Sequence, residues 1–429
     1  MTVAKPSGTG VHPLLAAAFD ALDHAGASWC VLRGEAELDR PRDVDLLVPD
    51  GDLARALPAL ADLGFVRLPA IGHGLHRFFV TYDEGAGVWL RLDIVGELGF
   101  GAYGALASDA TAACLGRAMK SGPVRLLARD DAFWTLLVRC LLDLGEVPPR
   151  HAPRVQELAP GATDANPLAL ELEQVLPPGW TVARVRTLAQ EASWSELSAL
   201  APEVRRRWAR RRPAMFLRRR ATGTALRLAR PLYTALRARG ISLALLGPDG
   251  SGKSRHVGSF AEAFTLLPVR TVYLGLYSYE RTPGRTGRLG RPVLLAWLVR
   301  TRLAIAWHLR RGRVVVCDRH TLEAHLREPA TGTPARLRRH LIALAAPRPD
   351  VLIILDAPAH VLAARKPEHT VAELEEQRQR YRELARRVPG AVALDTAGDR
   401  ESALRGIVAI LWNSYTQAMR SGIPARVRQ

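Results

Sequence analysis

The feature that most constrains the fold is the segment Gly-Pro-Asp-Gly-Ser-Gly-Lys-Ser at residues 247–254 of this 429-residue chain. It fits the pattern G-x-x-x-x-G-K-[ST], in which glycines turn backbone N–H groups toward phosphates, the lysine reaches the outer phosphates and the hydroxyl holds Mg²⁺. An apolar run at 241–246 precedes it and a helix-compatible stretch at 254–264 follows, so the loop would lie at a helix N-terminus. We therefore expect the cofactors ATP and Mg²⁺ here, bound by Gly247, Gly250, Ser251, Gly252, Lys253 and Ser254.

Two downstream strands place further charged residues at the same edge of the expected sheet. The strand in "RVVVCDRH" ends at Asp318, which would order Mg²⁺ or its waters or else cap the strand, and Arg319 follows directly. A further strand ends at Asp356. The segment "HVLAARK" then supplies Arg365 and Lys366, which would either cover the transferring phosphoryl group or remain solvated helix charges.

These segments, together with the later "RQRYRELA", resemble the thymidylate kinase family over about residues 241–416. The resemblance implies that Asp249 faces the hydroxyl of the phosphate acceptor and that Arg319 binds the acceptor's phosphate. It also implies that Lys253 and Arg365 contact the transferring group. The expected catalytic residues are Lys253, Asp249, Asp318, Arg319 and Arg365, and the expected metal ligands of this site are Ser254 and Asp318.

One segment departs from the family. After its second strand the family carries an R-E-P-G segment that helps organise the acceptor site, whereas residues 273–291 read "YLGLYSYERTPGRTGRLGR". The arginines of this stretch would bind an anionic acceptor or belong to a solvated loop; they are Arg281, Arg285, Arg288 and Arg291. We therefore expect a kinase whose small acceptor is a nucleoside monophosphate such as dTMP, or a sugar or related head group.

A second group of carboxylates lies in the first quarter of the chain. In the strand "DVDLLV" the side chains of Asp43 and Asp45 share a face, and Asp93 lies in the later strand "VWLRLDIV". Three carboxylates from neighbouring strands would hold two Mg²⁺ ions, one activating an attacking oxygen and one stabilising a leaving pyrophosphate. The order of these segments resembles the DNA polymerase β-like nucleotidyltransferase superfamily over about residues 14–145, and Gly34 would then belong to the loop that accepts the triphosphate.

The usual Gly-Ser of that superfamily is replaced by "RGE" at 33–35. Three alternatives stay open for this region. It is an active nucleotidyltransferase, a degenerate domain that only binds nucleotide or substrate, or an unrelated α/β domain with surface acids.

We expect an α/β chain in three parts. Residues 1–146 would form a mixed-sheet nucleotidyltransferase-like domain, 147–240 a helical arginine-rich connector, and 241–429 a parallel-sheet P-loop NTPase domain of thymidylate kinase type. The net charge of +18 comes largely from 204–240, which holds 13 arginines and no Asp or Glu. This segment would pack an apolar stripe on a neighbouring domain, lie on an anionic membrane surface, or contact nucleic acid. Nucleic acid is disfavoured because no nucleic-acid-binding module accompanies the segment, and a homodimer is left open.

Four widely spaced cysteines without a C-x-x-C pair argue against a disulfide framework or a structural zinc site. The N-terminus has no secretory pattern, so we expect a cytoplasmic protein. The hypothesis that uses both halves is a kinase coupled to nucleotidyl transfer by the first domain. The alternative is an ATP-binding regulatory protein whose nucleotidyltransferase-like domain is inactive.

Overall fold

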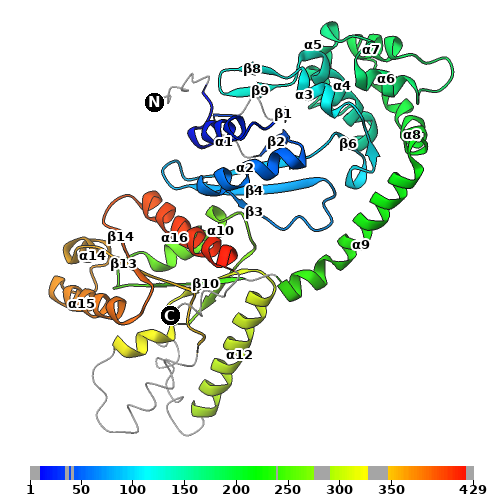
Figure 1. Ribbon diagram of the computed structural model, residues 1–429. Helices are drawn as coiled ribbons and strands as arrows, with labels where there is room; N and C mark the ends of the chain where they lie inside the picture. Colours follow the sequence, from blue (N-terminus) through cyan, green and yellow to red (C-terminus); the bar gives the residue numbers. More distant parts are fainter. Residues whose placement is uncertain are drawn as a thin grey trace. The chain divides into compact units, whose positions relative to one another are not determined.

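The computed structural model describes residues 10–33, 38–39, 43–237, 240–274, 290–326 and 346–421. The chain divides into two compact units, residues 1–83 with 88–230 and residues 84–87 with 231–429, which are described separately here (Figure 1). Gly34 and the arginines at 281, 285 and 288, which the sequence singled out, lie outside the described residues.

The N-terminal unit is built on a seven-stranded mixed sheet with the order β3-β4-β5-β2-β1-β9-β8 (Figure 1). Its β2–β5 and β1–β9 pairings are parallel and the other four are antiparallel. In β5 the alternation is strict, because Leu90, Leu92 and Ile94 are buried while Arg91 and Asp93 point to the opposite face. The strands are β1 (Cys30–Arg33), β2 (Val44–Leu47), β3 (Val66–Arg67), β4 (His76–Asp83), β5 (Val88–Val95), β8 (Met119–Ser121) and β9 (Val124–Leu126).

Helices pack on this sheet through two apolar clusters. The first joins the sheet to α1 (Pro13–His24) and α2 (Asp50–Asp62). The second joins Cys30 and Leu47 to a helical layer that continues far along the chain. Its helices are α3 (Thr111–Gly116), α4 (Arg129–Arg139), α5 (Ala152–Leu158), α6 (Pro167–Glu173), α7 (Val182–Gln190) and α8 (Trp194–Arg211), and a small ribbon is formed by β6 (Gly99–Phe100) with β7 (Leu106–Ala107).

Residues 147–230, most of the segment that the sequence assigned to a separate connector, therefore cluster with the N-terminal residues. The physical reason is the apolar face of α8, whose Leu197, Val204 and Trp208 are buried in the second cluster. The indole N–H of Trp208 also donates to the carbonyl of Ala107 at 3.0 Å. Within the described part of 204–240, Val204 and Trp208 are thus buried in this core, while the arginines are half-buried or exposed.

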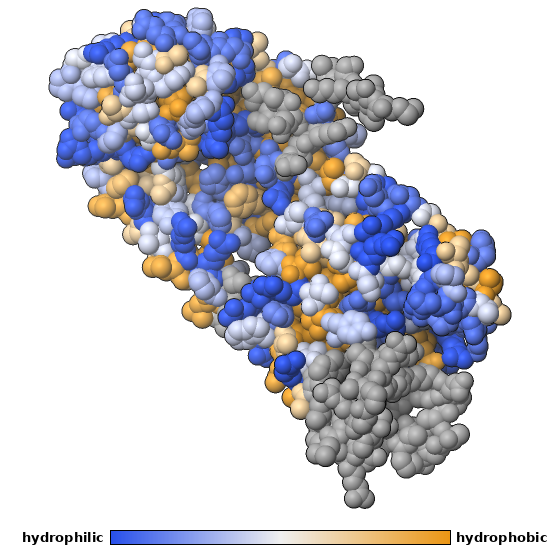
Figure 2. Space-filling view, turned by 180° about the vertical axis from the view of Figure 1, so that it is seen from behind, coloured by the Kyte–Doolittle hydropathy of each residue, from blue (hydrophilic) through white to orange (hydrophobic). Residues whose placement is uncertain are grey.

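The later part of the basic segment forms α9 (Pro213–Arg237). Arg219 fixes its start, donating to the carbonyl of Gly104 at 2.8 Å and pairing with Glu97. Leu217, Leu226 and Leu228 stay exposed among its arginines, and Figure 2 shows hydrophobic and hydrophilic residues alternating along the edge that this helix forms. The membrane-surface interpretation of this segment stays a prediction.

The C-terminal unit is a five-stranded sheet with the order β11-β12-β10-β13-β14, and all of its pairings are parallel. The parallel sheet predicted from the sequence is confirmed. Its central strands are continuous apolar runs because both of their faces are covered by helices. The strands are β10 (Ile241–Leu246), β11 (Val269–Tyr273), β12 (Val314–Asp318), β13 (Val351–Asp356) and β14 (Ala391–Asp395).

Helices cover both faces of the parallel sheet (Figure 1). Ile305 of α12 and Tyr381 and Leu384 of α15 pack on one face, and α10 and α16 lie on the other. These helices are α10 (Lys253–Ala263), α12 (Gly290–Arg310), α15 (Val371–Arg387) and α16 (Arg400–Ser421), and the short α14 (Ala359–Arg365) follows β13.

All four cysteines are buried and free. Burial raises the pKa of Cys30 and of Cys317 to about 12 and that of Cys140 to about 11, and it also raises the pKa of Cys114. Among the described helices, none combines the length and the apolar composition that a membrane crossing needs.

Candidate active site

The glycine-rich loop connects the end of β10 to the start of α10, as the sequence predicts. Gly247, Gly250 and Gly252 have φ angles of 151°, 83° and 86°, which side-chain-bearing residues rarely adopt. A Cβ atom at Gly247 would clash with the carbonyl oxygen of Leu355, and one at Gly250 would lie 2.7 Å from that of Leu362. The loop is therefore seated against the end of β13 and against α14, and only glycine fits there.

Lys253 is folded back onto this loop. Its buried ammonium donates to the carbonyls of Gly247 at 2.7 Å and Pro248 at 2.8 Å. Burial, followed by the nearby charge of Arg319, lowers the pKa of Lys253 to about 8. A desolvated cation whose hydrogen bonds go to neutral carbonyls gains when phosphate oxygens arrive, so this position suits a polyphosphate ligand.

Two buried oxygens, one in the loop and one next to it, have no hydrogen-bond partner within the described structure. They are the hydroxyl of Ser251 and Oδ1 of Asp318. Asp318 is the register partner of Leu245, next to the point where β10 enters the loop. Buried oxygens usually have a hydrogen-bond partner, so these two are positioned to contact a water, an ion or a ligand.

These oxygens fit Mg²⁺, which prefers carboxylate and hydroxyl ligands together with substrate phosphates and water. Asp318 and the exposed hydroxyl of Ser254 in the first turn of α10 are the residues that would hold it. Over the described ranges no group of three or more His, Cys, Asp or Glu side chains is arranged to hold a metal ion. A metal at this loop would therefore depend on phosphate and water for most of its ligands.

Asp249, the third residue of the loop, lies close to Arg319. Arg319 Nη2 lies 3.5 Å from Asp249 Oδ1, and His369 Nε2 lies 3.4 Å from Asp249 Oδ2. Burial acts to raise the pKa of Asp249, but Lys253, Lys366 and Arg319 together hold it below its ordinary value. Asp249 is thus an ionised carboxylate within the phosphate loop, with Lys253, Lys366 and Arg319 around it.

Arg319 also contacts a buried pair of residues, Glu323 and Tyr381, that the sequence did not indicate. Glu323 Oε2 lies 3.6 Å from Arg319 Nη1, and the hydroxyl of Tyr381 donates to Glu323 Oε1 at 2.7 Å. Burial raises the pKa of Glu323, although Arg319 and Tyr381 favour its charged form. The only local signal for this pair was an acidic residue four positions after Arg319.

Comparison with known proteins identifies the family of this chain. No protein-family model matches it. It is 30% identical to the thymidylate kinase of Xanthomonas campestris pv. campestris (strain B100) over 206 residues, which are 43% of this chain and 88% of that protein. The chain belongs to the thymidylate kinase family. The thymidylate kinase of Xanthomonas euvesicatoria pv. vesicatoria (strain 85-10) is 31% identical over 199 residues, 41% of this chain and 85% of its own length.

A solved structure of thymidylate kinase from Candida albicans is 13% identical, with a TM-score of 0.29, and it covers 43% of this chain and 93% of its own.

Arg365, which the resemblance places at the transferring group, and Asp356, at the end of β13, both have partners within the C-terminal unit. Arg365 donates to the carbonyls of Thr396 at 2.8 Å and Ala397 at 3.1 Å, so its guanidinium is bound to the segment after β14 and not to the phosphate loop. Asp356 accepts from Arg378 Nε at 2.8 Å, and Arg382 Nη2 lies 2.8 Å from it. In this structure Asp356 anchors α15, and Arg365 fixes the segment after β14.

The N-terminal carboxylates lie on or beside neighbouring strands, and each has a basic side chain as its partner. Asp45 and Asp93 are register partners in β2 and β5. Asp45 lies 2.6 Å from Arg33 Nε, and Asp93 lies 2.8 Å from His76 Nδ1. Asp43 is more exposed and lies 3.9 Å from Arg91. The structure thus brings two of the three predicted metal ligands side by side, Asp45 paired with Arg33 and Asp93 hydrogen-bonded to His76.

Proposed function

We propose that this chain is an ATP-dependent kinase that transfers a phosphoryl group to a small phosphorylated acceptor, with dTMP as the first candidate. The observation that carries the proposal is the phosphate loop, in which Lys253 is clasped by loop carbonyls beside the unsatisfied oxygens of Ser251 and Asp318. The relatives, all named thymidylate kinase, support the choice of acceptor.

Each residue has a role that its position supports. The loop N–H groups and the N-terminus of α10 would bind the ATP phosphates. Lys253 would exchange its two carbonyl partners for phosphate oxygens, offsetting the charge of the transferring group. Bound Mg²⁺, with Ser254 and Asp318 as protein ligands, would supply charge neutralisation at the phosphates.

The acceptor would bind on the side of Arg319. Its guanidinium, held between Asp249 and Glu323, would receive the acceptor's phosphate. Asp249 is ionised and would accept a hydrogen bond from an acceptor hydroxyl. Positioning of two anionic substrates by fixed cations is the main contribution that a protein makes to phosphoryl transfer.

The test is ADP formation by the purified full-length chain with ATP, Mg²⁺ and each of dTMP, dUMP, dCMP, dAMP and dGMP. Lys253→Ala and Asp318→Asn should each lower kcat by roughly a hundredfold or more, the scale expected when one charge-stabilising group is removed. Lys120→Ala, which removes an exposed lysine paired with Asp23, is the matched control and should leave kcat unchanged. The proposal fails if no nucleotide raises ADP formation above the rate without acceptor, or if both site variants retain full turnover.

Nucleotidyl transfer by the N-terminal unit stays a prediction. The register pairing of Asp45 and Asp93 favours it, but metal binding there would require Arg33 and His76 to release these carboxylates. Pyrophosphate release from nucleoside triphosphates, abolished in Asp93→Asn, would support it. ATP binding without turnover at either unit would instead favour the regulatory alternative.

A further inference from the structure

The N-terminal unit contains a cavity of about 750 Å³ between its mixed sheet and helices α4 and α5. Basic and hydroxyl side chains from separate elements line the cavity. Arg33 is the last residue of β1, Thr135 and Arg139 belong to α4, and Arg150 and His151 lie just before α5. The remaining wall is largely apolar and includes Leu32, Leu75, Val95, Leu98, Phe100 and Leu136. The volume is in the range of sites for small molecules.

Two of these polar side chains carry buried atoms that lack a partner in the described structure. Arg33 uses its Nε on Asp45 at 2.6 Å, but its Nη1 is buried without a hydrogen bond. The hydroxyl of Thr135 is likewise buried without a partner. Leaving a buried donor unsatisfied costs about 1–3 kcal/mol, and more when the group is charged, so the cavity is built to receive an acceptor from outside the chain.

Positive charge accumulates at the same place. Burial and the charge of Arg33 lower the pKa of Arg139, and burial with Arg139 and Arg150 lowers the pKa of His151. The acids of the lining already have partners: Asp143 accepts from the N–H of Gly101 and lies 3.7 Å from Arg139 Nε, Glu97 pairs with Arg219 and Glu157 with Arg154. An anion would relieve the repulsion among these cations.

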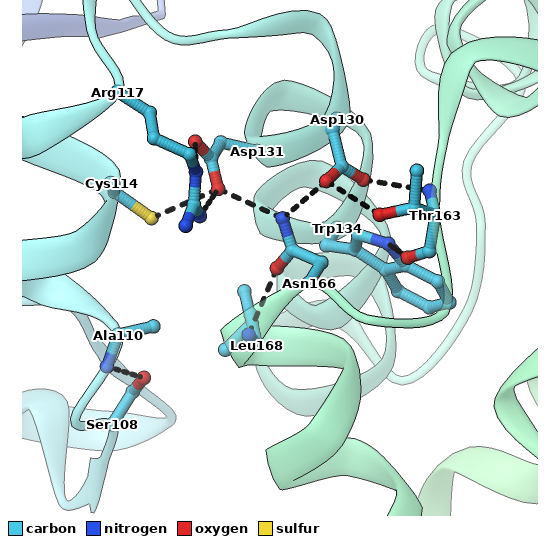
Figure 3. Close-up of polar contacts among 10 residues, drawn as sticks. All are labelled: Ser108, Ala110, Cys114, Arg117, Asp130, Asp131, Trp134, Thr163, Asn166 and Leu168. Carbon is cyan, nitrogen blue, oxygen red and sulfur yellow. Dashed lines mark hydrogen bonds and ion pairs between the residues drawn. The ribbon is translucent and has the colours of Figure 1, made fainter.

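A buried polar network holds the first turn of α4 in place (Figure 3). Asp131 is fully buried and accepts from Arg117 Nε at 3.0 Å and Asn166 Nδ2 at 2.9 Å. Asp130 accepts from the N–H of Thr163 at 2.9 Å. Because α4 is tied at Asp130 and Asp131, Thr135 and Arg139 one and two turns later are preorganised for a ligand.

We infer that this cavity binds a phosphate monoester of a small, largely apolar molecule without a divalent metal. The phosphate is held by Arg33, Thr135 and Arg139, and the apolar part lies against the leucine-rich wall. A metal is not required because the nearby Asp45 and Asp93 already have Arg33 and His76 as hydrogen-bonding partners. The site is separate from the phosphate loop and does not depend on the proposed kinase activity.

Phenyl phosphate is a suitable probe because it joins one phosphate to an apolar ring. Its binding is measured by calorimetry on the full-length chain carrying Lys253→Ala, which weakens phosphate binding at the loop, in buffer containing EDTA. We expect saturable binding that Thr135→Val and Arg139→Gln each weaken about tenfold, and no binding of phenol. Thr135→Val keeps the side-chain shape, so its effect does not depend on how well Arg139→Gln folds.

Arg206→Gln is the matched control, since Arg206 is exposed on α8 and pairs with Glu203 away from the cavity lining. It should bind the probe as the parent does. Equal affinity in the parent and both cavity variants overturns the inference, as does binding of phenol as strong as that of phenyl phosphate. Binding that appears only with Mg²⁺ overturns the metal-free site.

Discussion

Arg319 has a left-handed backbone, with φ of 66°, and it directly follows the unsatisfied Asp318. This conformation costs a residue with a Cβ atom about 1–2 kcal/mol. Its contacts with Asp249 and Glu323 offset that cost and hold the guanidinium near the phosphate loop. Strain of this kind persists where the surroundings fix a side chain for binding, which agrees with the proposed role of Arg319 toward an acceptor.

Glu323→Gln tests this arrangement. The amide oxygen still accepts from Tyr381, but the ion pair with Arg319 is lost. We expect KM for the acceptor to rise about tenfold while KM for ATP and kcat change little, because only the placement of Arg319 is affected. Glu383→Gln, on the exposed Glu383–Arg387 pair, is the control and should leave both KM values unchanged.

The pH dependence of stability in the same variant distinguishes two roles of Glu323, positioning Arg319 and stabilising the fold. Because burial raises the pKa of Glu323, the folded protein binds more protons there than the unfolded chain above pH 4.5, and the contribution of Glu323 to stability falls as pH rises through its folded pKa. Urea unfolding at several pH values should therefore show a smaller decrease of the unfolding free energy with pH in Glu323→Gln. The KM of this variant for the acceptor should still be raised. If KM for the acceptor rises only under conditions in which the variant has lost stability, the positioning role of Glu323 is contradicted.

Helix α4 shows how one element serves two purposes. Its first turn carries Asp130 and Asp131, which tie it to Arg117, Thr163 and Asn166, and its later turns line the cavity (Figure 3). A fully buried carboxylate with several donors around it stabilises only while all of them are satisfied. The network therefore fixes this helix more firmly than its apolar contacts alone.

Asp131→Asn should lower the free energy of unfolding of the N-terminal unit by about 2–3 kcal/mol, because an amide group replaces a charged acceptor facing Arg117 and Asn166. Urea unfolding followed by circular dichroism measures the change. Asp164→Asn removes the charge of a partly buried pair with Arg186 but keeps an acceptor oxygen, and it should cost less than about 1 kcal/mol. Similar losses in the two variants would show that the buried network adds nothing.

At the level of elements, local patterns predict strands and the phosphate loop well and distant contacts poorly. The strands β10, β12 and β13 could be predicted because a parallel strand covered on both faces needs an unbroken apolar run. The helices up to α8 could not be assigned to a unit, since the partner of Trp208 is Ala107, far away in the chain. Spacing placed Arg365 after a strand but could not show that Thr396 would engage it.

The molecule as a whole combines two units, each with a core of its own. The apolar clusters described for the N-terminal unit lie within residues 11–216, and the buried apolar residues described for the C-terminal unit lie within residues 241–412. The phosphate loop lies in the second unit and the 750 Å³ cavity in the first. A ligand at one site therefore acts first on the stability of the unit that binds it.

Differential scanning calorimetry of the full-length chain should show two transitions. A non-hydrolysable ATP analogue with Mg²⁺ should raise only the transition of the C-terminal unit, by the equivalent of about 2.7 kcal/mol at a hundred times its Kd. Lys253→Ala should abolish this shift. A single transition, or an equal shift of both, would show that the units unfold together.

The four buried thiols have a practical consequence. Since every cysteine of the chain is enclosed and its pKa is raised, maleimide reagents at neutral pH find almost no native thiolate to attack. A cysteine introduced on the exposed surface of each unit would then be the preferred point of attachment for a dye. A donor and acceptor pair placed in this way would report by energy transfer how ATP or a phosphate ester changes the distance between the labels.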